Sequence, residues 1–183
     1  MQQIISLLME NKPGALMRVT GVLSQRGYNI ESLTVSRTID PALSRMTISV
    51  DVEANIRPQV IKQMNKLVNV LQATDVTEGP GIHRELILLR VRSTPESRAS
   101  ILKEANLFKA QLVDSTNDSL VLEATGEDEK LEELINSMTS FGATEVTRSG
   151  VVSMSLDNRK MRLSPPVARR VAREESLELQ QTE

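Results

Sequence analysis

The 183 residues suffice for one ordinary domain or two small ones, and a hydrophobic fraction of 39% suffices for a packed core. Because there is no cysteine, disulfides, zinc–thiolate sites and thiol nucleophiles are excluded, which fits a reducing cytoplasm. With a net charge of −2, the chain has no overall positive field to attract nucleic acid or an anionic membrane. The apolar stretch from Ile4 ends by Glu10, which is far too short to span a membrane.

The first half of the chain shows hydrophobic patterns in the order β-α-β-β-α-β. The patterns predict strands at Gln3–Met9, Tyr28–Arg37, Arg45–Val52 and Val70–Thr77, and helices at Ala15–Arg26 and from Asn55 to Val68. We expect Gly27 to end the first helix, since glycine favours the left-handed conformation there. Asn55 can cap the second helix, with Pro58 in its first turn.

After the short linker Gly79-Pro80-Gly81 the same order begins again. Strands are predicted at Glu85–Arg92, Ala110–Ser115, Leu120–Thr125 and Ala143–Arg148, one helix after the cap Thr94-Pro95 up to Phe108, and another from Glu127 to Met138 before Gly142. The predicted fold class is therefore α+β, with two ferredoxin-like βαββαβ domains. We expect a first domain at 1–78, a linker at 79–83, a second domain at 84–155 and an exposed tail at 156–183; one larger α+β domain is the alternative.

Residues for catalysis are hard to find in this sequence. His83 is the single histidine and is interpreted as an exposed linker residue, since no second histidine or cysteine could complete a triad or a metal site. The acidic runs Glu127-Asp128-Glu129 and Glu132-Glu133 suit a helix start and a solvated helix face better than acid–base catalysis. We therefore expect no catalytic residues, no metal site and no cofactor in this chain.

The turn from Asn11 to Leu16 is the exception, because it has the groups that a free amino acid needs. The helix start at Gly14 and Ala15 offers N–H groups to a carboxylate, and glycine lets the ligand approach closely. Asn11 and Asn29 can accept from the ammonium, while Leu16 and Ile30 can line an aliphatic pocket. Ordinary turn chemistry remains an alternative explanation for these residues.

Several segments resemble the small regulatory subunits of acetolactate synthase (acetohydroxyacid synthase). The run from Arg26 to Val35, with the sequence RGYNIESLTV, looks like that family's signature, and Asp40-Pro41 followed by LSRMT continues it. Arg84-Glu85-Leu86 and the run RSGVV from Arg148 to Val152 are similar to the start and end of the family's C-terminal domain. The resemblance extends over 1–163.

This resemblance implies an N-terminal ACT domain that binds valine, leucine or isoleucine at a homodimer interface. Asn11, Gly14, Ala15 and Leu16 of one subunit would face Asn29 and Ile30 of the other. The edge strand carrying Tyr28, Glu31, Leu33 and Val35 would pair with its copy, which removes an exposed edge. The implied partner is a catalytic large subunit that holds thiamine diphosphate, magnesium and FAD, so that this chain regulates acetolactate formation by feedback inhibition and activation.

Other functions fit the sequence less well. An RNA-recognition module needs aromatic residues on its first and third strands, and Gln3–Met9 and Arg45–Val52 have none. An acylphosphatase-like enzyme needs an arginine in the first loop, where only Lys12 is present. A stand-alone ACT-type amino-acid sensor without a catalytic partner is the alternative that sequence separates least well.

Overall fold

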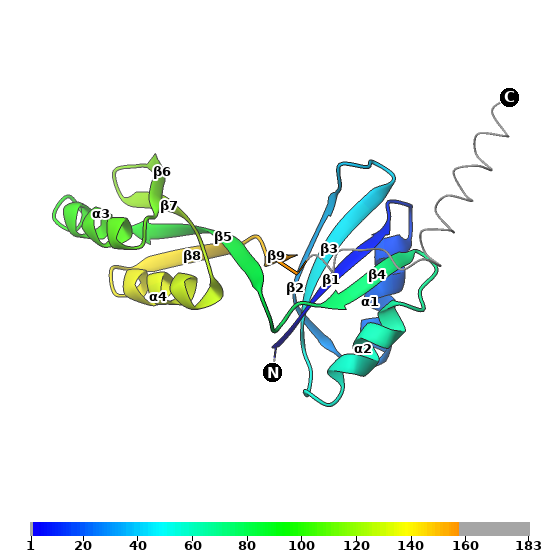
Figure 1. Ribbon diagram of the computed structural model, residues 1–183. Coiled ribbons are helices and arrows are strands. Elements are labelled where there is room, and N and C mark those ends of the chain that lie inside the picture. The colour runs from blue at the N-terminus through cyan, green and yellow to red at the C-terminus, as the bar shows by residue number, and fades with distance from the viewer. Residues whose placement is uncertain (1, 158–183) are drawn as a thin grey trace, which may run out of the picture. The chain divides into compact units, whose positions relative to one another are not determined.

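The computed structural model describes residues 2–157, which form two compact units (Figure 1). Among these residues, the first unit comprises 2–82 with 153–157, and the second comprises His83–Val152. All but the first two residues of the expected tail at 156–183 lie outside the described residues. Each unit is described by itself below.

The first unit is a four-stranded antiparallel sheet with two helices. Its elements are β1 (Gln2–Glu10), α1 (Ala15–Gln25), β2 (Asn29–Arg37), β3 (Leu43–Asp51), α2 (Arg57–Met64) and β4 (Val70–Asp75). The strand order is β2-β3-β1-β4, so β2 and β4 are the two edges. This is the ferredoxin-like arrangement, which confirms the predicted α+β fold class.

One face of this sheet carries the core. Alternate residues of β1 and β3 are fully buried against both helices, because side chains along a strand point to opposite faces. The largest of these buried side chains are Ile5, Leu7, Met46 and Ile48 on the sheet and Leu23 and Met64 on the helices. The other face is mixed, and its central strands carry Ser6, Thr47, Ser49 and Arg45 beside Ile4 and Leu8.

Gly27 ends α1 as predicted. Its φ of 71° is left-handed, which glycine adopts without steric cost. The N–H of Tyr28 donates to the carbonyl of Leu23 at 3.1 Å, and the N–H of Gly27 donates to that of Ser24 at 3.0 Å. These two hydrogen bonds form a Schellman motif, which turns the chain directly into β2.

The predicted extent of the second helix is wrong at both ends. α2 begins at Arg57 without a side-chain cap and ends at Met64, so Val68, 64% exposed, is not part of its buried face. The early end has a physical cause in Asn65. Its amide accepts from the N–H of Ala73 at 2.9 Å and donates to the carbonyl of Ala73 at 3.1 Å, which ties the helix end to β4.

The second unit repeats the strand order of the first. Its elements are β5 (Gly81–Arg92), α3 (Arg98–Leu107), β6 (Gln111–Ser115), β7 (Ser119–Gly126), α4 (Asp128–Thr139) and β8 (Ala143–Arg148). A last strand, β9 (Val152–Ser155), follows, and its residues from Ser153 onward belong to the first unit, although the sequence predicted them in the second domain. The sheet order is β6-β7-β5-β8, and β9 pairs with β5. Ile87, Leu89, Leu122 and Leu131 are among the buried residues that form its core.

Two features of this region differ from expectation. β5 begins at Gly81, so His83 lies half-buried in a strand and not in an exposed linker. β9 was not predicted, because a four-residue strand with exposed Val152 and Met154 has too little pattern to detect. Both differences have the same cause, which is the pairing of β9 with β5. Because the two strands lie far apart in the sequence, no local pattern indicates this pairing.

Thr94 caps the turn that leads into α3. Its N–H donates to Oγ of Ser97 at 2.9 Å, and the N–H of Ser97 donates to Oγ1 of Thr94 at 3.2 Å. This reciprocal pair is a capping box one turn before the first residue of α3. The predicted cap is therefore confirmed, while the regular helix starts later, at Arg98.

Candidate functional site

The loop between β1 and α1 is held in place by Asn11. Its backbone N–H donates to the carbonyl of Ala42 at 2.7 Å, and its Nδ2 donates to the carbonyl of Pro41 at 2.9 Å. The side-chain amide therefore directs its donor into the protein, and Oδ1 is the atom suited to accept from a ligand ammonium. The role of Asn11 as an acceptor for the ammonium stays a prediction, which a ligand complex would test.

Gly14 is the N-cap of α1 and lies in the left-handed region, with a φ of 80°. A Cβ at this position would meet nothing within 4 Å, so the glycine opens directly onto free space. Ala15 is buried beneath it, whereas the side chain of Leu16 is 41% exposed and that of Met17 is 77% exposed. The N–H of Ala15, expected to serve a ligand carboxylate, donates to the carbonyl of Lys12 at 3.2 Å, so this donor is already engaged and the open space lies at the positive dipole end of the helix.

A buried carboxylate organises the charges around this loop. Glu10 is only 8% exposed and lies 3.5 Å from Nζ of Lys12, measured from its Oε1. Its other oxygen accepts from the amide of Asn69, and the oxygen of that amide accepts from the guanidinium of Arg18. Lys12 thus pairs with Glu10 directly, and Arg18 is linked to the same carboxylate only through the amide of Asn69.

Sequence reasoning missed the role of Glu10 and Asn69. The available signal was a glutamate at the end of an otherwise apolar strand, because a buried charge needs a partner. The partner lies in the loop after α2, 59 residues further on. No local pattern indicates a contact of that range.

Asn29 and Ile30 lie at the other end of the same sheet. On β3, Asp51 pairs with Asn29 of β2 on one side and with Gln2 of β1 on the other, so Asn29 lies level with the start of β1. Glu10, at the end of β1, pairs with Leu43 at the other end of β3. The eight-residue difference along β1 corresponds to about 26 Å at the usual rise of a strand. All of α1 separates the two groups in sequence, so one chain does not bring Asn29 and Ile30 to the Asn11 loop.

Among the described residues, β2 is an edge strand of its sheet. Tyr28 and Ile30 pack partly against the core, while Val35 is 42% exposed. The register shifts between Ile30 and Ser32, where Glu31 forms a bulge and accepts a hydrogen bond from the amide of Asn29. Leu33 follows as a half-buried residue in the middle of the strand. Pairing of this edge with a second copy stays a prediction.

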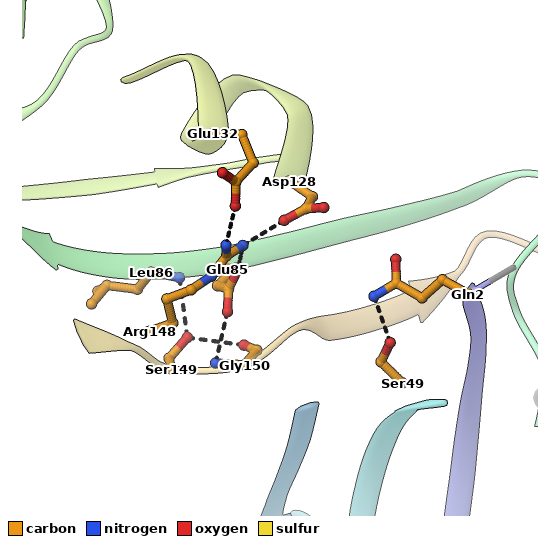
Figure 2. Close-up of polar contacts among 9 residues, drawn as sticks. All are labelled: Gln2, Ser49, Glu85, Leu86, Asp128, Glu132, Arg148, Ser149 and Gly150. Atoms are coloured by element: carbon orange, nitrogen blue, oxygen red, sulfur yellow. Dashed lines mark hydrogen bonds and ion pairs between the residues drawn. The ribbon is translucent and has the colours of Figure 1, made fainter. Parts of the chain in front are cut away.

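The second unit contains a different charged cluster, in which Arg148 is bound by three carboxylates (Figure 2). They belong to Glu85 on β5 and to Asp128 and Glu132 on α4. The hydrogen bonds that Arg148 donates to Glu85 are the main cause that raises the pKa of Arg148. Asp128 and Glu132 were interpreted as dipole and solubility features, and this is incomplete, because both also hold the end of β8 against α4.

The described residues offer little else for chemistry. Nowhere in 2–157 do three or more His, Cys, Asp or Glu side chains gather as they would to hold a metal ion. Over the same residues, the helices are too short or too polar to cross a membrane. The Asn11 loop, with open space beside Gly14 and with Lys12 and Arg18 nearby, stays the predicted site for a small zwitterion.

Comparison with known proteins identifies the family. A family model described as the small subunit of acetolactate synthase matches residues 84–157, and one described as an AHAS small subunit-like ACT domain matches 5–72. A probable acetolactate synthase small subunit of Archaeoglobus fulgidus is 44% identical over 160 residues, covering 87% of this chain and all of that protein. The chain belongs to the acetolactate synthase small-subunit family.

Two further relatives agree with this assignment. The acetolactate synthase isozyme 3 small subunit of Salmonella typhimurium is 39% identical, covering 88% of this chain and 100% of that protein. The crystal structure of the acetolactate synthase small subunit from Thermotoga maritima superimposes with a TM-score of 0.77 at 31% identity, covering 86% of this chain and 99% of that one. The similarity to small subunits, together with the match to an ACT domain, supports a regulatory role for the chain.

Proposed function

We propose that this chain is the regulatory subunit of acetolactate synthase. In this proposal two copies pair their first sheets along β2 and bind a branched-chain amino acid, valine or its relatives leucine and isoleucine, in the seam. Binding inhibits a catalytic large subunit that the same chain otherwise activates. Thiamine diphosphate, magnesium and FAD belong to that large subunit.

One observation supports an amino-acid site that is shared between two subunits. The Asn11 loop and the pair Asn29–Ile30 lie at opposite ends of β2's sheet, as the register of β1, β2 and β3 requires. If β2 pairs antiparallel with its own copy, the beginning of one strand meets the end of the other. Asn29 and Ile30 of the partner subunit then come to the end of the sheet that carries the Asn11 loop, and each dimer has two sites.

The chemistry of the two halves suits a branched-chain amino acid. The start of α1, with Lys12 and Arg18 nearby, favours the carboxylate, and the oxygen of Asn11 is placed to accept from the ammonium. Leu16 and the partner's Ile30 supply apolar surface, and burial of an aliphatic side chain there is worth roughly 1.5–3 kcal/mol. A ligand that binds only the dimer shifts assembly or conformation by its differential affinity.

A stand-alone amino-acid sensor is the alternative function. The match of residues 84–157 to the small-subunit model favours the subunit, because that stretch lies entirely beyond the ACT match. Purification with a cognate large subunit, followed by measurement of acetolactate formation with and without each amino acid, separates the two. A chain that neither co-purifies with the large subunit nor changes its activity would be a sensor only.

The shared site is tested by complementation between two defective variants, Gly14→Asp and Asn29→Ala. In either homodimer both sites carry one change, so valine binding measured by calorimetry should be weak. Coexpression of the two variants gives mixed dimers in which one site carries both changes and the other carries neither. With random pairing, roughly a quarter of all sites should bind valine normally. If mixing restores nothing, the site does not span two chains.

A further inference from the structure

One buried residue between α2 and β4 holds both ends of the turn that connects β1 to α1. Asn69 is 6% exposed and lies directly before β4. Its carbonyl accepts from the backbone N–H of Glu10 at 2.8 Å, and its Nδ2 donates to the carboxylate of the same residue. Its Oδ1 accepts from the guanidinium of Arg18. Because Glu10 ends β1 and Arg18 lies in the first turn of α1, Asn69 joins the two sides of the turn.

The residues predicted to bind an amino acid lie between these two anchors. Asn11, Gly14 and Leu16 follow Glu10 and precede Arg18 in the chain. The backbone N–H of Arg18 donates to the carbonyl of Gly14 at 3.1 Å, so Arg18 lies one helical turn from the N-cap. A shift of Arg18 relative to Glu10 would therefore move the start of α1 relative to Asn11.

The hydrogen bonds of Asn69 differ from those of the other asparagine in the same connection. Burial of an amide is unfavourable unless its polar atoms are hydrogen-bonded, and the donor and acceptor of Asn69 both bind residues that flank the turn. Asn65 instead binds the backbone of Ile61 and Ala73, which braces α2 against β4. The two asparagines therefore stabilise different parts of the unit.

We propose that Asn69 is a positioning residue of the amino-acid site. Its side chain holds Glu10 and Arg18 in fixed relation and so keeps the turn from Asn11 to Leu16 in the conformation that binds a branched-chain amino acid. This inference rests on the proposed function, because it concerns the affinity of that same site. Without the amide, the ligand must order the turn as it binds, and this loss of conformational entropy lowers the affinity.

Two alanine variants of the full chain test this role. Asn69→Ala and Asn65→Ala each remove side-chain hydrogen bonds, so both should lower the stability measured by urea unfolding. In calorimetry without urea, only Asn69→Ala should weaken valine binding. We expect about tenfold weaker binding, the effect of ordering roughly one residue of backbone. A residue that only stabilised the fold would leave the affinity of the folded protein unchanged.

An exchange of donor and acceptor tests whether Asn69 acts through Glu10. Asn69→Asp keeps the size of the side chain and an acceptor for Arg18, but it sets a second carboxylate against Glu10 and should weaken valine binding. Addition of Glu10→Gln to the same chain supplies an amide donor to the new carboxylate. The double variant should bind valine about fivefold more tightly than Asn69→Asp alone. This pair decides the question if Asn69→Ala does not fold.

The outcomes separate the positioning role from the function on which it rests. If the native chain binds valine and Asn69→Ala binds it equally well, the role of Asn69 is wrong and the site stands. Equal losses of affinity in Asn65→Ala and Asn69→Ala, or no recovery in the double variant, would also overturn the role. If the native chain binds neither valine, leucine nor isoleucine, the amino-acid site itself is wrong, and the positioning role falls with it.

Discussion

Nε of Arg148 donates to the buried carboxylate of Glu85 at 3.0 Å, across the ends of β8 and β5. Glu85 is only 5% exposed and also accepts from the backbone N–H of Gly150 at 3.0 Å. One carboxylate thus fixes both the last residue of β8 and the turn that follows it. Figure 2 shows how Asp128 and Glu132 complete the set around the same guanidinium.

Replacement of Arg148 by methionine should therefore destabilise the protein. The change leaves Glu85 buried without its cation, and we expect a loss of about 2 kcal/mol, less than for a fully buried pair because the arginine is one-third exposed. Urea unfolding followed by circular dichroism measures it. The double variant Arg148→Met with Glu85→Gln should recover part of the loss, and a single variant as stable as the native chain would show that the pair contributes nothing.

Gly14→Asp should weaken valine binding by electrostatic repulsion. The new carboxylate would stand in the open space beside the start of α1 and repel the carboxylate of the ligand, by about 1 kcal/mol or more at 4 Å. Gly14→Asn is the matched control, because it has the same size and the same strain at a φ of 80° but no charge. Calorimetry should find that the Gly14→Asp variant binds valine roughly tenfold more weakly than the Gly14→Asn variant. Equal affinities would mean that the ligand carboxylate lies elsewhere.

Val35→Lys should dissociate the proposed dimer. Lysine on an edge strand opposes pairing, and the two-fold axis would bring the change into the seam twice. We expect light scattering to report monomers at concentrations where the native chain is dimeric, with loss of valine binding. Leu107→Lys is the control, since that residue is 70% exposed at the end of α3 in the second unit. A dimer that survives Val35→Lys intact would contradict the β2 seam.

Asp75 should make the first unit sensitive to acid. Burial acts to raise the pKa of Asp75, but hydrogen bonds from Thr77 and Gln3 and the charge of Arg57 outweigh it, so that the pKa is lowered. A lowered pKa in the folded state contributes stability above the ordinary aspartate range, and this is lost as the pH falls through the folded value. The stabilisation should therefore be complete at pH 6 and should decline below roughly pH 4.

Asp75→Asn tests this dependence. The variant should lose less stability than the native chain between about pH 5 and pH 2, as thermal unfolding at a series of pH values would reveal. Glu78→Gln is the control, because Glu78 pairs with the same Arg57 at 3.1 Å but is 87% exposed and contributes little. Parallel pH profiles for the native chain and Asp75→Asn would refute the assignment to this carboxyl.

The order of elements could be predicted because periodic apolar residues report local structure. The stripe of Val19 and Leu23 indicated α1, and Gly27 marked its end, since both depend on neighbours within a few residues. The early end of α2 could not be foreseen, because it depends on hydrogen bonds between Asn65 and Ala73 that exist only in the folded sheet.

The candidate site was predictable in its residues but not in its geometry. Asn11 and Gly14 stand out as turn residues before a helix, and Asn29 stands out through family resemblance. That Asn29 lies at the far end of the sheet follows only from strand register, which is set by tertiary pairing. The links between Arg148 and Glu85 and between Glu10 and Asn69 also join distant parts of the sequence, and side-chain periodicity carries no information about them.

The nine residues of β2 have a consequence for how two bound ligands can communicate. In the dimer of the proposed function, one ligand would lie at each end of this strand, so the two ligands would be separated by about 26 Å along the seam. This exceeds the screening length of about 8 Å at physiological salt, so the two zwitterions exert almost no force on each other. Cooperativity between them must be transmitted by the polypeptide, through the hydrogen-bonded ladder that each ligand helps to close.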